Sequence, residues 1–143
     1  MAKLVGARVR NSANISCTSG VDTHLTFDTE DYDYDTIHDL STNTNRLTCK
    51  TAGIYVIMGS VWWPNNATGS RTLSIWFGGA TVIASVRYGH ASVGDYEGQS
   101  VTCTYALAVN EYVELIARQS SGGALNAAYL AAYSPVFAMH KVG

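Results

Sequence analysis

Hydrophobic positions along this chain recur with the two-residue period of β-strands, and the spacing of an amphipathic helix is nearly absent. Short runs rich in β-branched and aromatic residues are separated by clusters of Gly, Asn, Ser and Asp, which favour turns. The pattern predicts about nine strands. They are Val5–Arg10, His24–Phe27, Arg46–Cys49, Gly53–Trp63, Thr72–Phe77, Thr81–Val86, Ser100–Ala108, Tyr112–Arg118 and Ser134–His140.

The predicted strands follow one another without room for crossover helices, which indicates antiparallel pairing. We therefore expect an all-β antiparallel sandwich, formed by residues 1–143 as a single domain, since 143 residues is an ordinary domain length. Gly78-Gly79 lies between two apolar strands and predicts a tight hairpin, because glycine adopts positive φ at little cost.

The segment Gly53–Trp63 is apolar on both of its faces. Successive side chains of a strand point to opposite faces, so Ile54, Met58 and Trp62 share one face while Ile57 and Val61 share the other. In a monomeric sandwich one face is usually polar. We expect the second face to be covered, either by another subunit or, alternatively, by a long loop or a fully wrapped internal position.

The composition also favours self-assembly. Hydrophobic residues make up 47% of the chain and charged residues 14%, against about 25% charged residues in a typical soluble domain. A chain so poor in charge is expected to bury part of its surface against copies of itself.

Several classes of partner are not favoured by the sequence. The net charge is −2 and the basic residues are scattered, so we expect no nucleic-acid partner. The sequence contains no run of about 18 apolar residues, so no membrane-spanning segment is predicted. The N-terminal residues 1–6 lack the apolar core of a secretory leader, so we expect synthesis in a cytoplasm and exit in or on a particle.

The segments around the central strand resemble the C1q-like and tumour-necrosis-factor-like (TNF-like) jelly rolls. In that family an apolar strand leads through a short turn into Gly-x-Tyr and a long strand, as residues 46–55 do here. The segments 25–33, 73–79, 105–115 and 134–139 match further family segments in the same order. Asn110-Glu111 replaces the family's usual Gly-Asp, and the last strand has few of its aromatic residues.

The resemblance implies a jelly-roll sandwich that forms a trimer and acts as a non-enzymatic binding or structural module. We predict that the second apolar face of the central strand, with its neighbours, forms the trimer interface. The residues assigned to it are Tyr55, Ile57, Val61, Trp63, Tyr105, Val113, Leu115 and Phe137.

Catalytic signatures are not found in the sequence. The four histidines, His24, His38, His90 and His140, share no ligand spacing, and no nucleophile elbow or phosphate-binding loop occurs. We therefore expect no enzymatic activity and no organic cofactor. The three cysteines, Cys17, Cys49 and Cys103, are interpreted as free thiols, with one disulfide and a spare thiol as the alternative.

Two clusters carry candidate binding chemistry. Asp31, Asp33 and Asp35 alternate as in a calcium loop, but the glycine and glutamate of that loop are missing, so a solvated acidic segment anchored by its tyrosines is the favoured interpretation. Trp63 is a candidate for stacking on carbohydrate, against the alternative of burial in the core or an interface.

Together these observations favour a homotrimeric surface protein of a bacteriophage virion, either a capsid decoration protein or a receptor-binding tip. Its expected partners are copies of itself and capsid or tail proteins, or a host-surface glycan. The alternative is a secreted, extracellular C1q-like lectin or recognition module that binds carbohydrate.

Overall fold

The computed structural model describes residues 3–89 and 94–143, which form β-strands joined by turns and loops. Within these ranges no helix is long or apolar enough to cross a membrane. The strands in chain order are β1 (Gly6–Arg10), β2 (Ile15–Cys17), β3 (Thr23–His24), β4 (Thr29–Asp33), β5 (Arg46–Thr48), β6 (Gly53–Trp63), β7 (Ser70–Phe77), β8 (Thr81–Gly89), β9 (Glu97–Leu107), β10 (Tyr112–Gln119), β11 (Leu125–Ala127) and β12 (Val136–Lys141).

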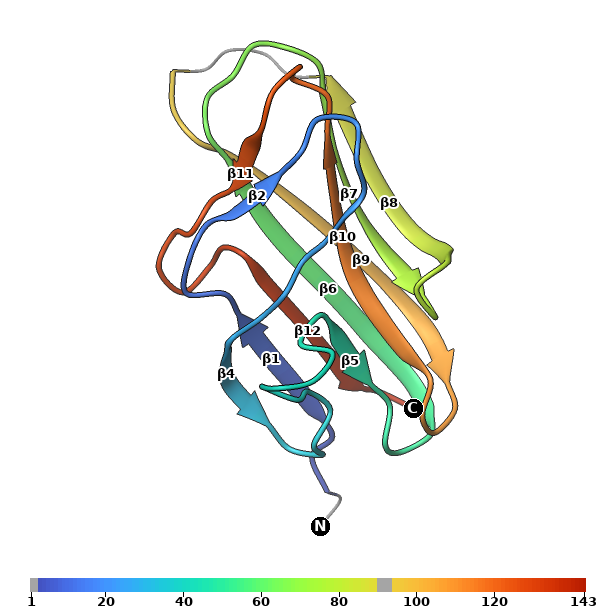
Figure 1. The fold of residues 1–143 in the computed structure, drawn as a ribbon. Coiled ribbons are helices and arrows are strands. Elements are labelled where there is room, and N and C mark those ends of the chain that lie inside the picture. The colour runs from blue at the N-terminus through green and yellow to red at the C-terminus, as the bar shows by residue number, and fades with distance from the viewer. Residues whose placement is uncertain (1–2, 90–93) are drawn as a thin grey trace.

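Two antiparallel sheets form the layers of a sandwich (Figure 1). The first has the strand order β4-β1-β12-β6-β9, and the second has the order β3-β10-β7-β8 with β5 beside β10. A short pair, β11 and β2, lies at one end. The fold is therefore the predicted all-β, antiparallel jelly-roll sandwich.

The first and last strands are neighbours in the five-stranded sheet. Gly6 lies opposite His140, and the amide of Lys141 donates to the carbonyl of Val5 at 2.9 Å. Beyond β12, the amide of Ile54 donates to the carbonyl of Gly143 at 2.8 Å. The N- and C-terminal ends consequently lie in the same lower part of the molecule, as Figure 1 shows.

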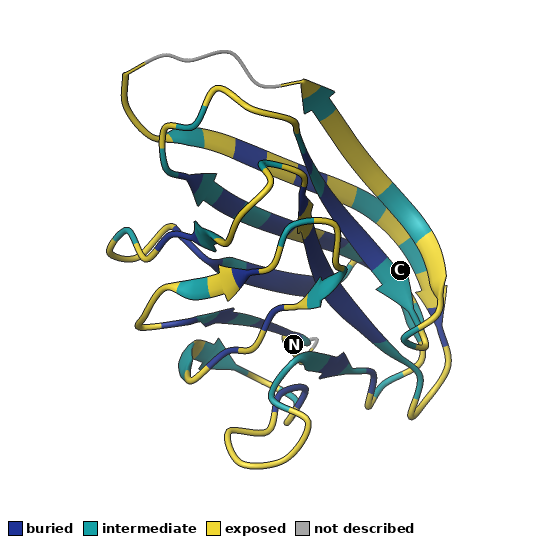
Figure 2. Ribbon diagram, turned by 45° about the horizontal axis from the view of Figure 1, so that its top comes forward, coloured by how far each residue is buried: buried dark blue, intermediate teal, exposed yellow. Residues whose placement is uncertain are grey.

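The hydrophobic core lies between the two sheets. Tyr55, Ile57, Val61 and Trp63 of β6 have no accessible surface, whereas alternate residues on the same strand face outward. Gly59 continues this inward row, and a Cβ at that position would overlap the side chain of Leu115 on β10. The missing side chain of Gly59 therefore permits the two sheets to pack closely here. Figure 2 shows the buried residues gathered along the strands.

Eight of the predicted strands correspond to long or well-paired strands, and Gly53–Trp63 is predicted with its observed bounds. His24–Phe27 is mostly wrong, because the strand β3 consists of Thr23 and His24 and ends where the predicted strand begins. Three strands were not predicted: β2 and β11, which have three residues each, and β4, whose sequence is acidic. Each is held by pairing with a neighbour that lies far along the chain.

The predicted hairpin at Gly78-Gly79 is confirmed. Both glycines have positive φ, 63° and 75°, and they join the paired strands β7 and β8. The amide of Ala80 donates to the carbonyl of Phe77 at 3.3 Å, which closes the turn across the two glycines, and Phe77 pairs with Thr81. Asn110 also has a positive φ, 73°, at the turn between β9 and β10, where the resemblance leads one to expect glycine.

Candidate self-association surface

The outward side of the five-stranded sheet forms a broad surface, which we call the five-strand outer face. Met58, in the middle of β6, is 40% exposed, and Ile54, at the start of the same strand, is 48% exposed. Strand register places them beside small or polar residues of β9 and β12. The face is formed by Ile54, Val56, Met58, Ser60 and Trp62 of β6, by Ser100, Thr102, Thr104 and Ala106 of β9, and by Val136, Ala138 and His140 of β12.

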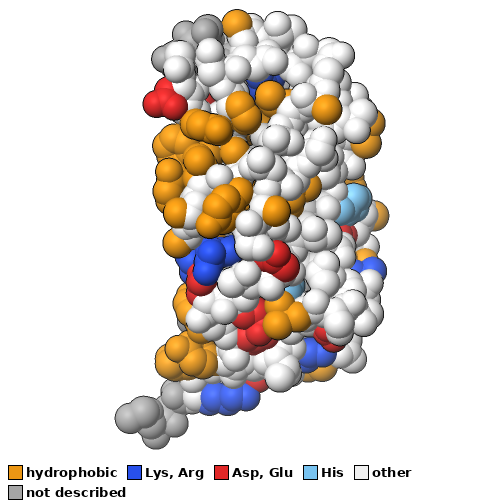
Figure 3. All heavy atoms as spheres, turned by 60° about the vertical axis from the view of Figure 1, so that its left-hand side comes forward, with side chains coloured by type: hydrophobic (Ala, Val, Ile, Leu, Met, Phe, Trp, Pro, Cys, Tyr) orange, Lys and Arg blue, Asp and Glu red, His pale blue; other side chains and the backbone are white. Residues whose placement is uncertain are grey.

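Exposed hydrophobic side chains also lie at the margins of the molecule. Leu4, Tyr34 and Val142 are exposed near the chain ends, and Tyr133 is exposed on the loop before β12. Figure 3 shows hydrophobic side chains in groups along one side, separated by charged ones. Isolated exposed hydrophobic residues are ordinary, but several on one sheet face are typical of a contact surface.

The predicted interface residues lie in the core between the two sheets, so that prediction is wrong. Seven of them have no accessible surface within the single chain, and Tyr105 is half-buried against the same core. A side chain enclosed between the two sheets of one chain cannot contact another chain. The seven enclosed residues are Tyr55, Ile57, Val61, Trp63, Val113, Leu115 and Phe137.

The five-strand outer face was missed because both faces of β6 are apolar and periodicity does not tell them apart. A usable signal lay in the neighbouring strand. On β9 the residues that share the outer face are small or hydroxylated, such as Thr102 and Thr104, whereas Val101 and Leu107 face the core. Aligning the two strands would have identified Ile57 and Val61 as core residues.

A charged cluster crosses the five-strand outer face on β1 and β4. Arg10 Nε donates to Asp31 Oδ1 at 2.8 Å, and Arg8 Nη1 pairs with the other carboxylate oxygen. Arg8 Nη2 also donates to the carbonyl of Ala132 at 2.8 Å, which ties this cluster to the loop before β12. Two guanidinium groups share one carboxylate, so the cluster retains one net positive charge.

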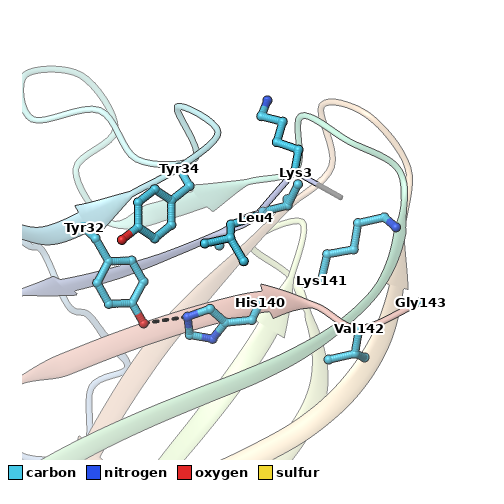
Figure 4. Close-up of a pocket in the computed structure, with 10 residues that line it drawn as sticks. Lys3, Leu4, Tyr32, Tyr34, His140, Lys141, Val142 and Gly143 are labelled. Atoms are coloured by element: carbon cyan, nitrogen blue, oxygen red, sulfur yellow. Dashed lines mark hydrogen bonds between the residues drawn. The ribbon is translucent and has the colours of Figure 1, made fainter. Parts of the chain in front are cut away.

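A cavity of about 560 Å³ opens near the chain ends, between the N-terminal segment, β4 and the end of β12 (Figure 4). The rings of Tyr32 and Tyr34 stack with centroids 5.3 Å apart. The Tyr32 hydroxyl lies 2.6 Å from His140 Nε2. Leu4 and Val142 supply apolar walls. The cavity therefore combines aromatic, apolar and hydrogen-bonding groups.

Burial lowers the pKa of His140 below its usual value of 6.5. The cause is desolvation, which disfavours the imidazolium form. A neutral imidazole accepts a hydrogen bond through its unprotonated nitrogen, so the Tyr32 hydroxyl donates to Nε2. This pair fixes the Tyr32 ring beside β12.

An aromatic group lies at the other end of the five-strand outer face. The rings of Trp62 and Tyr133 meet edge to face with centroids 5.6 Å apart, and Tyr129 and Tyr133 are 42% and 49% exposed. Ser134 fixes the loop, because its hydroxyl donates to the carbonyl of Ala128 at 2.7 Å and accepts from the amide of Trp62 at 2.9 Å. We call Trp62, Tyr129 and Tyr133 the aromatic loop cluster.

Trp63, the candidate carbohydrate residue, cannot stack on a sugar, because it has no accessible surface. Its indole Nε1 donates to Gln99 Oε1 at 2.9 Å inside the core. The alternative of core burial is confirmed. Trp62 and Trp76 are the tryptophans that reach the surface.

The candidate calcium residues Asp31, Asp33 and Asp35 do not converge on one site. Asp31 pairs with the two arginines of β1, and Asp35 accepts from Lys3 Nζ at 2.6 Å and from the Thr51 hydroxyl at 2.8 Å. Asp33 accepts only backbone amides. Among the described residues no group of three or more metal-binding side chains forms, so the geometry does not support a calcium site.

The histidines have separate environments. His24 Nδ1 lies 2.8 Å from Glu114 Oε1, and the ring meets Trp76 edge to face. His38 lies between Glu30 and the carbonyl of Thr44. In the described part of the chain neither ring contacts a serine, threonine or cysteine side chain that would act as a nucleophile. His90 lies outside the described residues.

Cys17, Cys49 and Cys103 are free thiols in the structure, as the favoured interpretation predicts. Burial raises the pKa of the Cys17 and Cys103 thiols, because the thiolate is poorly solvated there. A thiol with a raised pKa is a weak nucleophile at neutral pH, so these groups act as small core residues.

These two sheets, with their strand order and a β6 that spans the sandwich, define a C1q-like and TNF-like jelly-roll fold. Murine APRIL superimposes with a TM-score of 0.73 at 10% identity, covering 98% of this chain and 100% of that one. The globular domain of zebrafish complement 1qA gives 0.64 at 14% identity, covering 97% of this chain and 98% of that one. Eiger TNF from S. frugiperda gives 0.65 at 11% identity, covering 99% and 94%.

No family model matches the sequence, and no curated protein matches it either. At identities of 10–14% the likeness to these solved structures establishes the fold. The predicted resemblance to C1q-like and TNF-like jelly rolls is thereby confirmed at the level of architecture.

Proposed function

We propose that the chain assembles into a homotrimer through the five-strand outer face and acts as a non-enzymatic surface module. The observation that carries this proposal is the exposure of Ile54 and Met58 on a sheet face whose other side packs into the core. Burying such side chains stabilises an assembly by roughly 25 cal/mol for each Å² of apolar surface removed from water.

Support for three subunits comes from the resemblance to C1q-like and TNF-like domains, which implies a trimer. The edge strand β9 is compatible with close approach of a neighbour. Ser100, Thr102, Thr104 and Ala106 on its outer side are short, so another backbone can come near. An edge strand that another subunit covers is also protected from uncontrolled pairing.

The proposal is tested by light scattering coupled to gel filtration. We expect wild-type protein to have three times the 15.3 kDa chain mass. Met58→Asp introduces a charge at the centre of the five-strand outer face and is expected to give a folded monomer. Val82→Asp, at a 52% exposed position on the other sheet, is the matched control and should remain trimeric. A folded wild-type monomer at micromolar concentration would exclude the proposal.

We further propose that the trimer lies on the surface of a bacteriophage virion, as a capsid decoration protein or a receptor-binding tip. The three free thiols support synthesis in a reducing cytoplasm, where virion proteins are made and disulfides are rare. Mass spectrometry of purified virions tests this role. We expect the protein at a stoichiometry that is a multiple of three, and its absence from intact particles would contradict the role.

The aromatic loop cluster favours a second candidate, an extracellular recognition module that binds a host-surface glycan. Exposed aromatic rings on a fixed loop stack well on the apolar faces of sugars. On a glycan array, Tyr133→Ala should abolish binding, whereas Tyr34→Ala, at a similarly exposed tyrosine near the chain ends, should not. An array on which wild-type protein binds no glycan would exclude this candidate.

A further inference from the structure

A second cavity, of about 460 Å³, lies between residues 36–43 and β5. Strand β5 pairs with β10 in the other sheet, so this cavity is not part of the five-strand outer face. Its lining is mainly polar and includes two cations, Arg46 and Lys50. We call it the β5 cavity.

Arg46 is the unusual residue of the β5 cavity. Its guanidinium carbon lies 4.0 Å from the centroid of the Tyr112 ring, and this cation–π contact holds the group against the ring. Its Nε is fully buried and has no hydrogen-bond partner within the described residues. A buried donor without an acceptor carries an unrecovered desolvation cost, and such groups in folded proteins call for a specific explanation.

Other donors line the same cavity. Lys50 is exposed, and its ammonium makes no hydrogen bond or ion pair among the contacts of the described residues. The hydroxyls of Thr42 and Thr48, both in the lining, likewise have no protein acceptor in the part of the chain that the structure describes. The cavity thus holds a fixed guanidinium, an ammonium and two hydroxyls that are available to donate.

Two further titratable groups, Asp39 and His38, line the cavity. Asp39 repels an anion, and His38 has no free ring nitrogen to bind one. The Asp39 carboxylate is negative, but its Oδ1 accepts from the amides of Ser41 and Thr42 at 2.8 and 3.0 Å. Both ring nitrogens of His38 are occupied, at 3.0 Å from Glu30 Oε2 and 2.9 Å from the Thr44 carbonyl. Asp39 should therefore weaken anion binding through its charge, but its carboxylate does not form an ion pair with Arg46.

We propose that the β5 cavity binds an oxyanion, with Arg46 as its principal ligand. Phosphate, sulfate and the carboxylate of an acidic sugar share the required chemistry, because each offers oxygens in the spacing of the guanidinium fork. The anion binds through the terminal Nη groups of Arg46, and the buried Nε of the same guanidinium plane reports the binding. Lys50 and the threonine hydroxyls complete the site. The site does not depend on trimer formation or on a virion role.

Nitrogen-15 NMR of the full chain tests the proposal, because the arginine Nε–H group gives its own signal. The protein is titrated separately with inorganic phosphate, inorganic sulfate and glucuronate, at ionic strength balanced with sodium chloride. We expect a saturable shift of the Arg46 Nε–H signal, and the anion that binds tightest identifies the source. Glucose is the neutral control. A shift no larger than that given by sodium chloride for all three anions overturns the proposal.

Variants locate the site. Arg46→Gln should weaken binding about tenfold or more, since it removes charge-assisted hydrogen bonds. Arg87→Gln, the same change at an exposed position on β8, should leave the affinity unaltered. The trimer should persist in both variants, which separates failure of this site from failure of the self-association proposal.

A second pair of variants decides the matter if Arg46→Gln does not fold. Lys50→Gln should weaken binding about two- to fivefold, and Asp39→Asn should tighten it by a similar factor, because each changes one charge at an exposed position beside the anion. Asparagine keeps the acceptor for the Ser41 and Thr42 amides. Unchanged affinity in both variants would overturn the assignment to the β5 cavity.

Discussion

Asp33 shows how one side chain can organise a segment that sequence alone leaves ambiguous. Its carboxylate accepts from the amides of Ile37 and His38 at 2.9 and 2.8 Å, and from that of Asp35 at 3.2 Å. The chain after β4 turns around this carboxylate. A residue that was a candidate calcium ligand is thus occupied by backbone donors.

We predict that Asp33→Ala lowers the free energy of unfolding by about 1–3 kcal/mol, because several partly buried amides lose their acceptor. Urea denaturation measures the change. Asp22→Ala, in an exposed ion pair with Arg118, is the control and should change the value by less than about 1 kcal/mol. A chelator should leave the melting temperature unaltered. A lower melting temperature in the chelator would revive the calcium hypothesis.

His140 links pH to stability. Its folded pKa is depressed below 6.5, so the unfolded chain binds a proton as the pH falls through 6.5 while the folded chain does not. The free energy of unfolding should therefore fall below pH 6.5 and level off once the pH is under the folded pKa.

Thermal melts between pH 7 and pH 5 test this dependence, since these values lie above the ordinary carboxylate pKa of 3.8. In His140→Gln the decline due to this group should disappear, while Tyr32 keeps a polar partner. An equal decline in the variant and the wild type would assign the pH dependence to other groups.

Substitutions on the two faces of strand β6 should have different effects, because one face is in the core and the other is at the surface. Val61 on β6 and Leu115 on β10 face the core, whereas Met58 faces outward. We predict that Val61→Asp and Leu115→Asp unfold the chain, because an unpaired buried charge costs several kcal/mol. Met58→Asp should keep the β-sheet spectrum. Far-ultraviolet circular dichroism distinguishes the outcomes, and folded Val61→Asp protein would show that the core assignment is wrong.

Strand β6 also shows which features of the fold could be predicted from the sequence and which could not. The bounds of β6, the antiparallel class and the glycine hairpin follow from period and turn chemistry, which act locally. The buried side of β6 depends on the register with β9 and β12, which are distant in the chain. The short strands β2 and β11 form only because they pair with each other. Arg46 and Tyr112 meet through the pairing of β5 with β10, which no local pattern indicates.

For the molecule as a whole, assembly should be visible in its stability. If folded chains associate and unfolded chains do not, mass action raises the melting temperature as the protein concentration rises. We predict this dependence for wild-type protein and for Val82→Asp, and a melting temperature independent of concentration for Met58→Asp. Differential scanning calorimetry over a wide concentration range provides the measurement. A wild-type melting temperature that does not change would argue against association.

Because β1 and β12 are neighbours, the two ends of the sandwich differ: one carries both chain ends and the other carries loops. This difference decides which loops face outward when the protein is attached to a surface. Both ends of the chain leave the sandwich at one pole, while the loops 64–69 and 120–123 lie at the other, held together where Ser120 meets Ser70. A tether at either end therefore holds the module in the same orientation and points the same loops outward. For the same reason a short linker would suffice to join the ends, and circular permutants opened at residues 120–123 should keep the core intact.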